Sequence, residues 1–76
     1  MNNHDMNMPG GIEAELVYGD GDFNVVRRGD YVVCAVTGVR IPIERLRYWS
    51  VERQEAYATP EASMKRYLET HARPKP

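Results

Sequence analysis

Residues 34–63, CAVTGVRIPIERLRYWSVERQEAYATPEAS, decide the fold of this chain. A tight turn is predicted at residues 37–38, Thr-Gly, which close the apolar segment before them. Apolar and polar residues alternate over residues 46–51, as in a half-buried strand, and residues 56–57 fit a short returning strand. Residues 59–60, Thr-Pro, have the form of a helix start, with a capping hydroxyl before a proline at the first helical position. A turn, a β-hairpin and a helix are therefore expected in this order.

Toward the N-terminus, the pattern predicts three more strands. Residues 12–18 alternate between apolar and polar, and residues 23–27 return after the Gly-Asp-Gly-Asp turn at 19–22. Residues 31–36 are almost continuously apolar, as in a central strand that is covered on both faces. These three segments indicate an antiparallel meander.

Residues 39–43 are expected to be extended, and Pro42 among them belongs on a sheet edge because it has no amide hydrogen. The C-terminal part is expected to be helical. After residue 60, helical spacing puts one set of residues on a single face: Met64, Tyr67, Leu68 and His71 or Ala72. The expected fold class is α+β, a small antiparallel β meander with hairpins and one C-terminal α-helix.

Four positions in residues 34–63 are spaced like the ligands of a treble-clef zinc finger, and the stretch resembles that motif. They are Cys34, Thr37, Ala58 and Ala62, and Gly38 stands at the knuckle glycine. Zinc requires about four nitrogen, sulfur or oxygen ligands, and three of these positions hold a hydroxyl or a methyl group. The resemblance therefore implies a degenerate, zinc-ribbon-like layout with no bound metal, in which small alanines fill the vacated site. No cofactor is expected.

A second resemblance is carried by GDF at 21–23, CAVTG at 34–38, IP at 41–42, LRYWSV at 46–51 and RQEAY at 53–57. Over most of residues 12–68, the chain resembles a family of short, uncharacterised alphaproteobacterial proteins that is classed as a domain of unknown function. This resemblance implies a bacterial cytoplasmic setting and no established activity.

The length of 76 residues suits one domain. Composition predicts a disordered tail at residues 1–11, a single α+β domain at 12–72 and a disordered end at 73–76. No apolar run is suited to a signal peptide or a membrane span, so no membrane association is expected. One cysteine, Cys34, excludes an internal disulfide and suits the cytoplasm.

Basic residues gather in the second half of the chain. Eight of the ten basic residues, but only five of the eleven acidic ones, lie from position 31 onward. On a strand, Arg45, Arg47 and Trp49 would point to one face. With Arg40 and Arg53 they form a candidate binding surface for phosphates and a stacked base, or for an acidic protein surface. The alternative is that Trp49 belongs to the core and that the arginines stack on it internally.

No catalytic constellation is evident, so an enzyme is not expected. Cys34 lies in an apolar strand and is expected to be an inert, buried thiol with a raised pKa. His4 lies in the expected tail, and His71 in the last helical turn, where a cation suits the helix dipole. Asp20 and Asp22 fit a turn, because a calcium loop needs further oxygen ligands that are absent.

Two function classes remain. The first is a non-catalytic interaction module that binds an unknown protein partner or forms a homodimer. The second is a nucleic-acid-binding accessory factor that uses the basic Arg/Trp face. Salt-dependent binding to single strands would distinguish the second class, because phosphate contacts release counterions.

Overall fold

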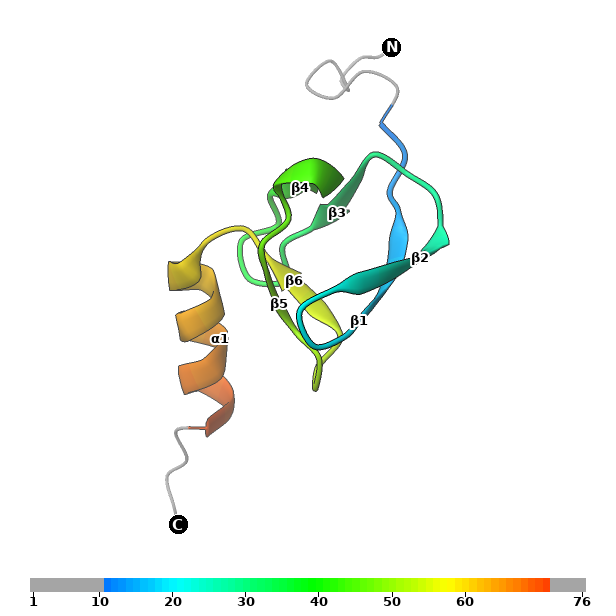
Figure 1. The fold of residues 1–76 in the computed structure, drawn as a ribbon. Coiled ribbons are helices and arrows are strands. Elements are labelled where there is room, and N and C mark those ends of the chain that lie inside the picture. The colour runs from blue at the N-terminus through cyan, green and yellow to red at the C-terminus, as the bar shows by residue number, and fades with distance from the viewer. Residues whose placement is uncertain (1–10, 72–76) are drawn as a thin grey trace.

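A computed structural model of the chain describes residues 11–71, and Figure 1 shows three hairpins with a helix at one side. The elements are β1 (Glu15–Tyr18), β2 (Phe23–Arg27), β3 (Tyr31–Val33), β4 (Arg40–Pro42), the 3₁₀ helix η2 (Ile43–Arg45), β5 (Tyr48–Ser50), β6 (Glu55–Tyr57) and α1 (Pro60–His71). The expected α+β class, with antiparallel hairpins and a C-terminal helix, is confirmed. Apart from Gly11, the tails expected at 1–11 and 73–76 lie outside the described residues.

Strands β1 and β2 form the first hairpin, in antiparallel register. The amide of Gly19 donates to the carbonyl of Asp22 at 2.7 Å and closes the turn. Gly21 has a φ of 80°, a left-handed conformation that a residue without a Cβ adopts at no steric cost. Tyr18 on β1 is buried, and Phe23 on β2 packs against the same core. The turn predicted from glycine and aspartate is therefore present.

Strands β3 and β4 form the second hairpin around the turn that follows Cys34. The amide of Cys34 donates to the carbonyl of Val39, and the amide of Gly38 donates to the carbonyl of Cys34, both at 2.9 Å. Gly38 has a φ of 79°, as this tight reversal requires. Strand β3 ends at Val33 rather than at residue 36, because the backbone at Cys34 already bonds across the turn.

Strands β5 and β6 form the third hairpin, in which Trp49 lies opposite Ala56. Gln54 turns the chain with a φ of 56°, and its amide donates to the carbonyl of Ser50 at 2.8 Å. The side-chain amide of Gln54 also pairs with the backbone of Tyr18 in the first hairpin. Its Nε2 donates to the carbonyl of Tyr18, and its Oε1 accepts from the amide of Tyr18, both at 2.9 Å.

Single backbone bridges join the three hairpins. A parallel bridge pairs Glu13 with Tyr31 and so connects the first hairpin to the second. A second parallel bridge pairs Cys34 with Ala56 and connects the second hairpin to the third. The backbone therefore runs through three small two-stranded sheets that touch at their ends.

The meander predicted for the first three strands is wrong, because β3 pairs with β4 and not with β2. The chain between β2 and β3 crosses the segment before β1 at very short range. A Cβ placed on Gly29 would lie 2.4 Å from the amide nitrogen of Ala14. Glycine permits this close approach, which carries β3 away from the edge of β2.

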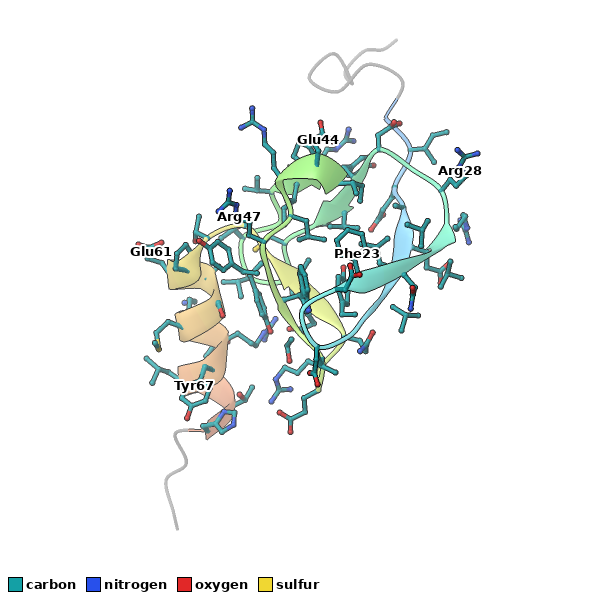
Figure 2. The ribbon with its side chains drawn as sticks, viewed as in Figure 1. Phe23, Arg28, Glu44, Arg47, Glu61 and Tyr67 are labelled. Carbon is teal, nitrogen blue, oxygen red and sulfur yellow. The ribbon has the colours of Figure 1, made fainter. Side chains whose placement is uncertain are left out.

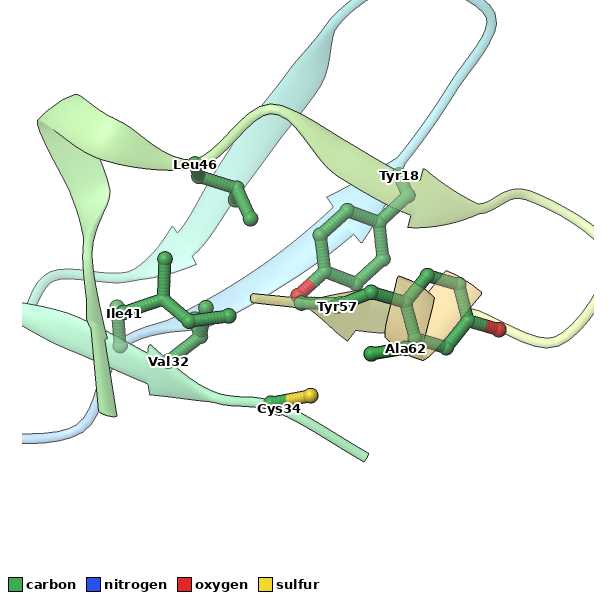
Figure 3. Packing of buried hydrophobic residues seen from close by; sticks show 9 residues of the cluster. Tyr18, Val32, Cys34, Ile41, Leu46, Tyr57 and Ala62 are labelled. Atoms are coloured by element: carbon green, nitrogen blue, oxygen red, sulfur yellow. The ribbon is translucent and has the colours of Figure 1, made fainter. Parts of the chain in front are cut away.

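The core lies where the hairpins meet, and Figure 3 shows its packing. Its buried members come from all three hairpins and from α1: Ala14, Tyr18, Val32, Cys34, Ile41, Leu46, Ala56, Tyr57 and Ala62. Half-buried apolar residues pack around them, Trp49 among them. This core is small, as expected for a domain of this length.

The helix α1 begins as the sequence predicts. The hydroxyl of Thr59 accepts a hydrogen bond from the amide of Ala62 at 3.0 Å, and Pro60 is the first helical residue. The cap satisfies one of the amides that the first turn leaves without a partner.

The structure shows which side of α1 packs inward, a point that the helical spacing leaves open. Ala62, which is 3% exposed, is the buried residue of the helix. Met64, Tyr67 and Leu68 share one face as predicted, but they are 55%, 55% and 53% exposed. The helical spacing identified these residues as one face. Ala62 packs against the core on the other side of the helix, where its small side chain allows α1 to lie close to the hairpins. Figure 2 shows Tyr67 near the end of α1, with side chains projecting away from the hairpins.

Candidate functional site

The thiol of Cys34 is buried beside polar groups of the turn that follows β3. Its side chain is the most deeply buried in the described chain, at 1% exposure. The amide of Thr37 donates to Sγ at 3.4 Å. The hydroxyl of Thr37 and the amides of Ala58 and Val36 also stabilise negative charge on the sulfur. The turn after β3 and the segment before α1 therefore both direct donors at this atom.

These donors change the acidity of the thiol. Burial alone raises the pKa of Cys34, but the hydrogen bonds from Thr37, Ala58 and Val36 stabilise the thiolate and lower the pKa below its ordinary value. The raised pKa expected from an apolar strand is therefore wrong. The physical reason is that the strand ends before Cys34, so the sulfur faces backbone amides instead of only apolar side chains.

Two of the positions matched to zinc ligands, Thr37 and Ala58, lie near the sulfur of Cys34. The amide of Thr37 donates to the sulfur, and the amide of Ala58 stabilises negative charge on it. Ala62 belongs to the same buried cluster as Cys34, with Ala58 packed against it (Figure 3). Chemically, the group around the sulfur consists of hydrogen-bond donors and methyl groups, which can stabilise a thiolate but cannot complete a metal tetrahedron. Within residues 11–71, no three His, Cys, Asp or Glu side chains gather in a way that could hold a metal ion.

Trp49 is engaged inside the molecule. Its indole Nε1 donates to the carbonyl of Gly19 at 2.9 Å. Its ring stacks on Tyr18 with 5.9 Å between centroids and meets the edge of Phe23 at 5.6 Å. The half-buried indole thus joins the third hairpin to the first. This packing corresponds to the alternative in which Trp49 is a core residue.

The arginines of the candidate binding surface lie on separate elements. Arg45 belongs to η2 and Arg47 precedes β5, so the strand that would align them with Trp49 does not extend that far. Both line a shallow groove beside Glu44 and Ala58. Arg40 on β4 lies over the ring of Tyr31, 4.3 Å from its centroid. Arg53 lines a different depression, between the third hairpin and α1.

The outer face of α1, formed by Met64, Tyr67 and Leu68, adjoins an apolar groove. Tyr48 from β5 and Pro60 and Ser63 from α1 line this groove together with Met64 and Tyr67. Its volume is about 330 Å³. The helical spacing predicted these residues as a group, but only the structure shows that they remain uncovered in residues 11–71.

A polar network on the inner side fixes α1 in place. The Nη2 atom of Arg66 donates to the carbonyl of Ala35 at 3.1 Å. Its Nε lies 3.2 Å from Oε1 of Glu55, an ion pair whose angle makes no hydrogen bond. Tyr57 donates its hydroxyl hydrogen to the same carboxylate oxygen at 3.0 Å. Sequence reasoning missed Arg66 and Gln54, because each acts on backbone groups more than thirty positions away and no local pattern indicates such partners.

These features define a small α+β domain of three β-hairpins and one docked helix. No helix in residues 11–71 is long and apolar enough to span a membrane. Residues 25–66 match the family described as "Uncharacterized protein conserved in bacteria" (DUF2093). The chain therefore belongs to this conserved bacterial family of uncharacterised function. No curated protein and no solved structure matches the chain.

Proposed function

We propose that this domain is a non-catalytic protein-interaction module in the bacterial cytoplasm, and that it binds a partner protein through the outer face of α1. The observation that carries the proposal is the orientation of the helix. One face of α1 has Ala62 against the core, and the opposite face exposes Met64, Tyr67 and Leu68. Grouped apolar side chains on a surface mark interaction sites more often than isolated ones do.

The partner proposed for this face is an amphipathic helix of another protein. Such a helix places apolar side chains three or four residues apart, and the groove between Tyr48 and α1 offers a complementary channel. The available area argues against a second α1 in this role. At about 200 Å² for each large side chain, the three half-exposed residues offer roughly 300 Å², against the roughly 800 Å² per partner of a standard interface. A partner helix longer than α1 is therefore needed to cover the groove and its surroundings.

We also infer that the scaffold descends from a treble-clef zinc finger. As the sequence resemblance implies, we further infer that the family occurs in alphaproteobacteria. What supports this inference is the position of Thr37 and Ala58 beside the sulfur of Cys34, together with the burial of Ala62 in the same cluster. A scaffold stabilised by packing in place of a metal keeps its exposed faces for binding. The proposal of binding without catalysis follows from this history and from the apolar character of the face.

The proposal can be tested with a photo-crosslinking residue placed at Leu68 of the full chain in its native host. A partner should be captured and identified, and the purified partner should bind the wild-type chain. The substitution Leu68→Glu should weaken this binding at least tenfold, equivalent to about 1.4 kcal/mol. The binding constant is measured by calorimetry with purified components.

A matched control is Val17→Glu, which also introduces an acidic residue at a half-exposed apolar position, but on β1. Val17→Glu should leave the affinity unchanged. The proposal is wrong if the two substitutions weaken binding equally, or if the captured partner contacts another face.

The nucleic-acid alternative makes a different prediction. It relies on Arg45 and Arg47, without a stacking indole, since Trp49 is packed against the first hairpin. Binding to single-stranded nucleic acid that falls steeply with salt and is lost in Arg45→Glu would favour this alternative over the interaction module.

A further inference from the structure

His71 continues the outer face of α1 to the end of the helix. It follows Leu68 by three positions, Tyr67 by four and Met64 by seven, the spacing that places side chains on one face. Its ring stacks on the ring of Tyr67, with 4.1 Å between centroids and 19° between planes. The apolar outer face therefore ends in an imidazole, which is a polar and titratable group.

Hydrogen bonds around this ring decide which of its nitrogens carries the hydrogen. The Nδ1 atom of His71 lies 2.9 Å from the carbonyl oxygen of Tyr67, which can only accept. Nδ1 also lies 3.1 Å from the hydroxyl oxygen of Thr70. That hydroxyl donates its single hydrogen to backbone carbonyls, at 2.9 Å to Arg66 and 3.2 Å to Tyr67, so its oxygen accepts from Nδ1. Both neighbours are acceptors, and the neutral ring therefore holds its hydrogen on Nδ1.

The second ring nitrogen, Nε2, is left as an acceptor. A neutral imidazole with hydrogen on Nδ1 has a free lone pair on Nε2. Within the part of the chain that the structure describes, the hydrogen bonds of His71 all use Nδ1, and the residue is exposed. A partner helix that lies along the whole outer face also removes water from Nε2. A buried acceptor without a donor is unfavourable, so the partner has to supply one.

We propose that Nε2 of His71 accepts a hydrogen bond from a hydroxyl or amide donor of the partner helix, and that protonation of the imidazole releases the partner. The inference rests on the proposed function and deepens it by stating which partners the outer face selects. The apolar side chains of Met64, Tyr67 and Leu68 supply area without direction, whereas one hydrogen bond fixes the register. A helix with an apolar residue at this position leaves Nε2 unpaired and is disfavoured.

Protonation reverses the role of Nε2. Both nitrogens of an imidazolium donate, so the donor of the partner would face another donor. In the free domain, the charge on His71 stays in water at the end of α1, where the helix dipole favours a cation. A bound partner removes that water, which disfavours the charge. Acid therefore stabilises the free domain relative to the complex, and histidine is the side chain suited to respond between about pH 5 and pH 8.

Charged and titratable groups of two neighbouring segments lie near this ring. The depression that His71 lines between the third hairpin and α1 is also lined by Glu52, Arg53, Tyr57, Arg66 and Tyr67. The guanidinium groups stay charged at every pH used here. The carboxylate of Glu52 belongs to another element than His71, and Glu52→Gln therefore serves as the control for the pH experiment.

The hydrogen on the ring can be observed without a partner. In the full chain labelled with ¹⁵N, NMR correlations of the imidazole ring should show hydrogen on Nδ1 of His71 at about pH 8. The signals are identified by their loss in His71→Phe, which separates them from those of His4. In Thr70→Val, which lacks the accepting oxygen, the share of the form with hydrogen on Nε2 should increase. Hydrogen on Nε2 of the wild-type ring would overturn the proposal.

Affinity is measured by calorimetry with the purified protein that the crosslinker at Leu68 captures. Wild-type affinity should fall roughly fivefold between about pH 7.5 and about pH 5.5. His71→Phe keeps a ring on Tyr67 but has no acceptor, so it should bind roughly fivefold more weakly at the higher pH and show no further loss in acid. Glu52→Gln should keep the pH dependence of the wild type.

A conservative variant separates the acceptor from the titrating group. In His71→Gln, an amide oxygen takes the place of Nε2 as acceptor and does not titrate, so affinity should be largely kept and should not depend on pH. A pH dependence that persists in His71→Gln would overturn release by this imidazole. All variants are first checked for native circular dichroism.

The outcomes distinguish this inference from the proposed function. Equal affinity of the wild type and His71→Phe, with binding still weakened in Leu68→Glu, would overturn the role of His71 and leave the outer face of α1 as the binding surface. Failure to capture a protein at Leu68, or unchanged affinity in Leu68→Glu, would overturn both.

Discussion

The indole Nε1 of Trp49 donates a hydrogen bond to the carbonyl of Gly19, 2.9 Å away and thirty positions earlier in the chain. This bond connects the third hairpin to the turn of the first. The ring of Trp49 also covers Tyr18 and meets the edge of Phe23. One side chain therefore holds together two of the three small sheets, neither of which would be stable alone.

Trp49→Phe should lower the free energy of unfolding by about 1–2 kcal/mol, because the aromatic contacts are largely kept while the carbonyl of Gly19 loses its donor. Urea unfolding followed by circular dichroism measures the loss. Arg47→Ala, two positions earlier and exposed, should change stability by less than about 0.5 kcal/mol. Equal stability of Trp49→Phe and the wild type would show that the indole is dispensable to the fold.

Gln54→Glu should destabilise the domain by about 2–3 kcal/mol at neutral pH. The side-chain amide donates to the carbonyls of Tyr18 and Val51 at 2.9 and 2.8 Å, and a carboxylate presents oxygen to both. Repulsion from these carbonyls raises the folded-state pKa of the introduced carboxyl group above its unfolded value of about 4.3.

The sign of the pH dependence follows from that raised pKa. The protonated form regains one donor, so the penalty in Gln54→Glu should be smallest below about pH 4 and should grow as pH rises through the folded-state pKa. Chemical unfolding at several pH values measures it. The control Glu52→Gln, in the same turn, should not show this dependence. A penalty that is independent of pH would contradict the donor role of Gln54.

The thiol of Cys34 should make stability depend on pH in the alkaline range. Burial raises its folded-state pKa, but the hydrogen bonds outweigh burial and lower it. The contribution of the thiol to stability is therefore fully present above the unfolded-state pKa of cysteine, about 8.5. It is lost as pH falls through the folded-state pKa. Unfolding free energies should therefore rise toward pH 8.5 in the wild type relative to Cys34→Ser, whose hydroxyl does not titrate there.

Two tyrosines give the free energy of unfolding the opposite pH dependence, and they do so at higher pH. The pKa of Tyr18 is raised by burial and by Glu13, and the pKa of Tyr57 by burial and by its hydrogen bond to Glu55. Their contribution to stability is fully present below a pH of about 10, which is the unfolded-state pKa of tyrosine. It is lost as the pH rises through their folded-state pKa values. Measurements for Cys34 therefore stay below pH 9. A difference between wild type and Cys34→Ser that does not change from pH 7 to 9 would contradict the lowered thiol pKa.

A zinc site should form when the three matched positions are changed to cysteine. The triple variant Thr37→Cys, Ala58→Cys, Ala62→Cys should bind one zinc ion through the three new cysteines and Cys34. The binding free energy should be roughly 10–16 kcal/mol, as in structural four-cysteine sites. Elemental analysis gives the stoichiometry, and the gain in melting temperature should disappear with chelator.

Two controls define the zinc experiment. The wild-type chain should contain no stoichiometric zinc, and chelator should not change its melting curve. A variant that keeps Ala62 offers only three thiolates and should bind more weakly. If the triple variant takes up no zinc, the treble-clef ancestry loses its physical basis.

Local chemistry accounts for the features that were predicted correctly. The turn at residues 19–22 follows from its glycines, and the start of α1 from Thr59 and Pro60, because the atoms that form these features are only a few residues apart. The same reasoning failed for the meander and for the length of β3. Those depend on the close approach of Gly29 to Ala14 and on the bonds of Cys34 across its turn.

The candidate sites were predicted only in part. Helical spacing grouped Met64, Tyr67 and Leu68, yet it could not distinguish a buried face from an exposed one. Alternation placed Trp49 on a face with two arginines, but η2 interrupts that strand.

The sequence by itself determined the class of fold, the turns and the helix start, because side chains and backbone within one or two turns of chain decide those states. Only the tertiary structure decided which side of α1 is covered, since Arg66 bonds to Ala35 and Ala62 meets the core far from it in sequence. It also decided the acidity of Cys34, because the amide of Ala58 reaches the sulfur only after the helix has docked. Contacts between distant segments depend on the packing of all three hairpins, and no local pattern encodes that packing.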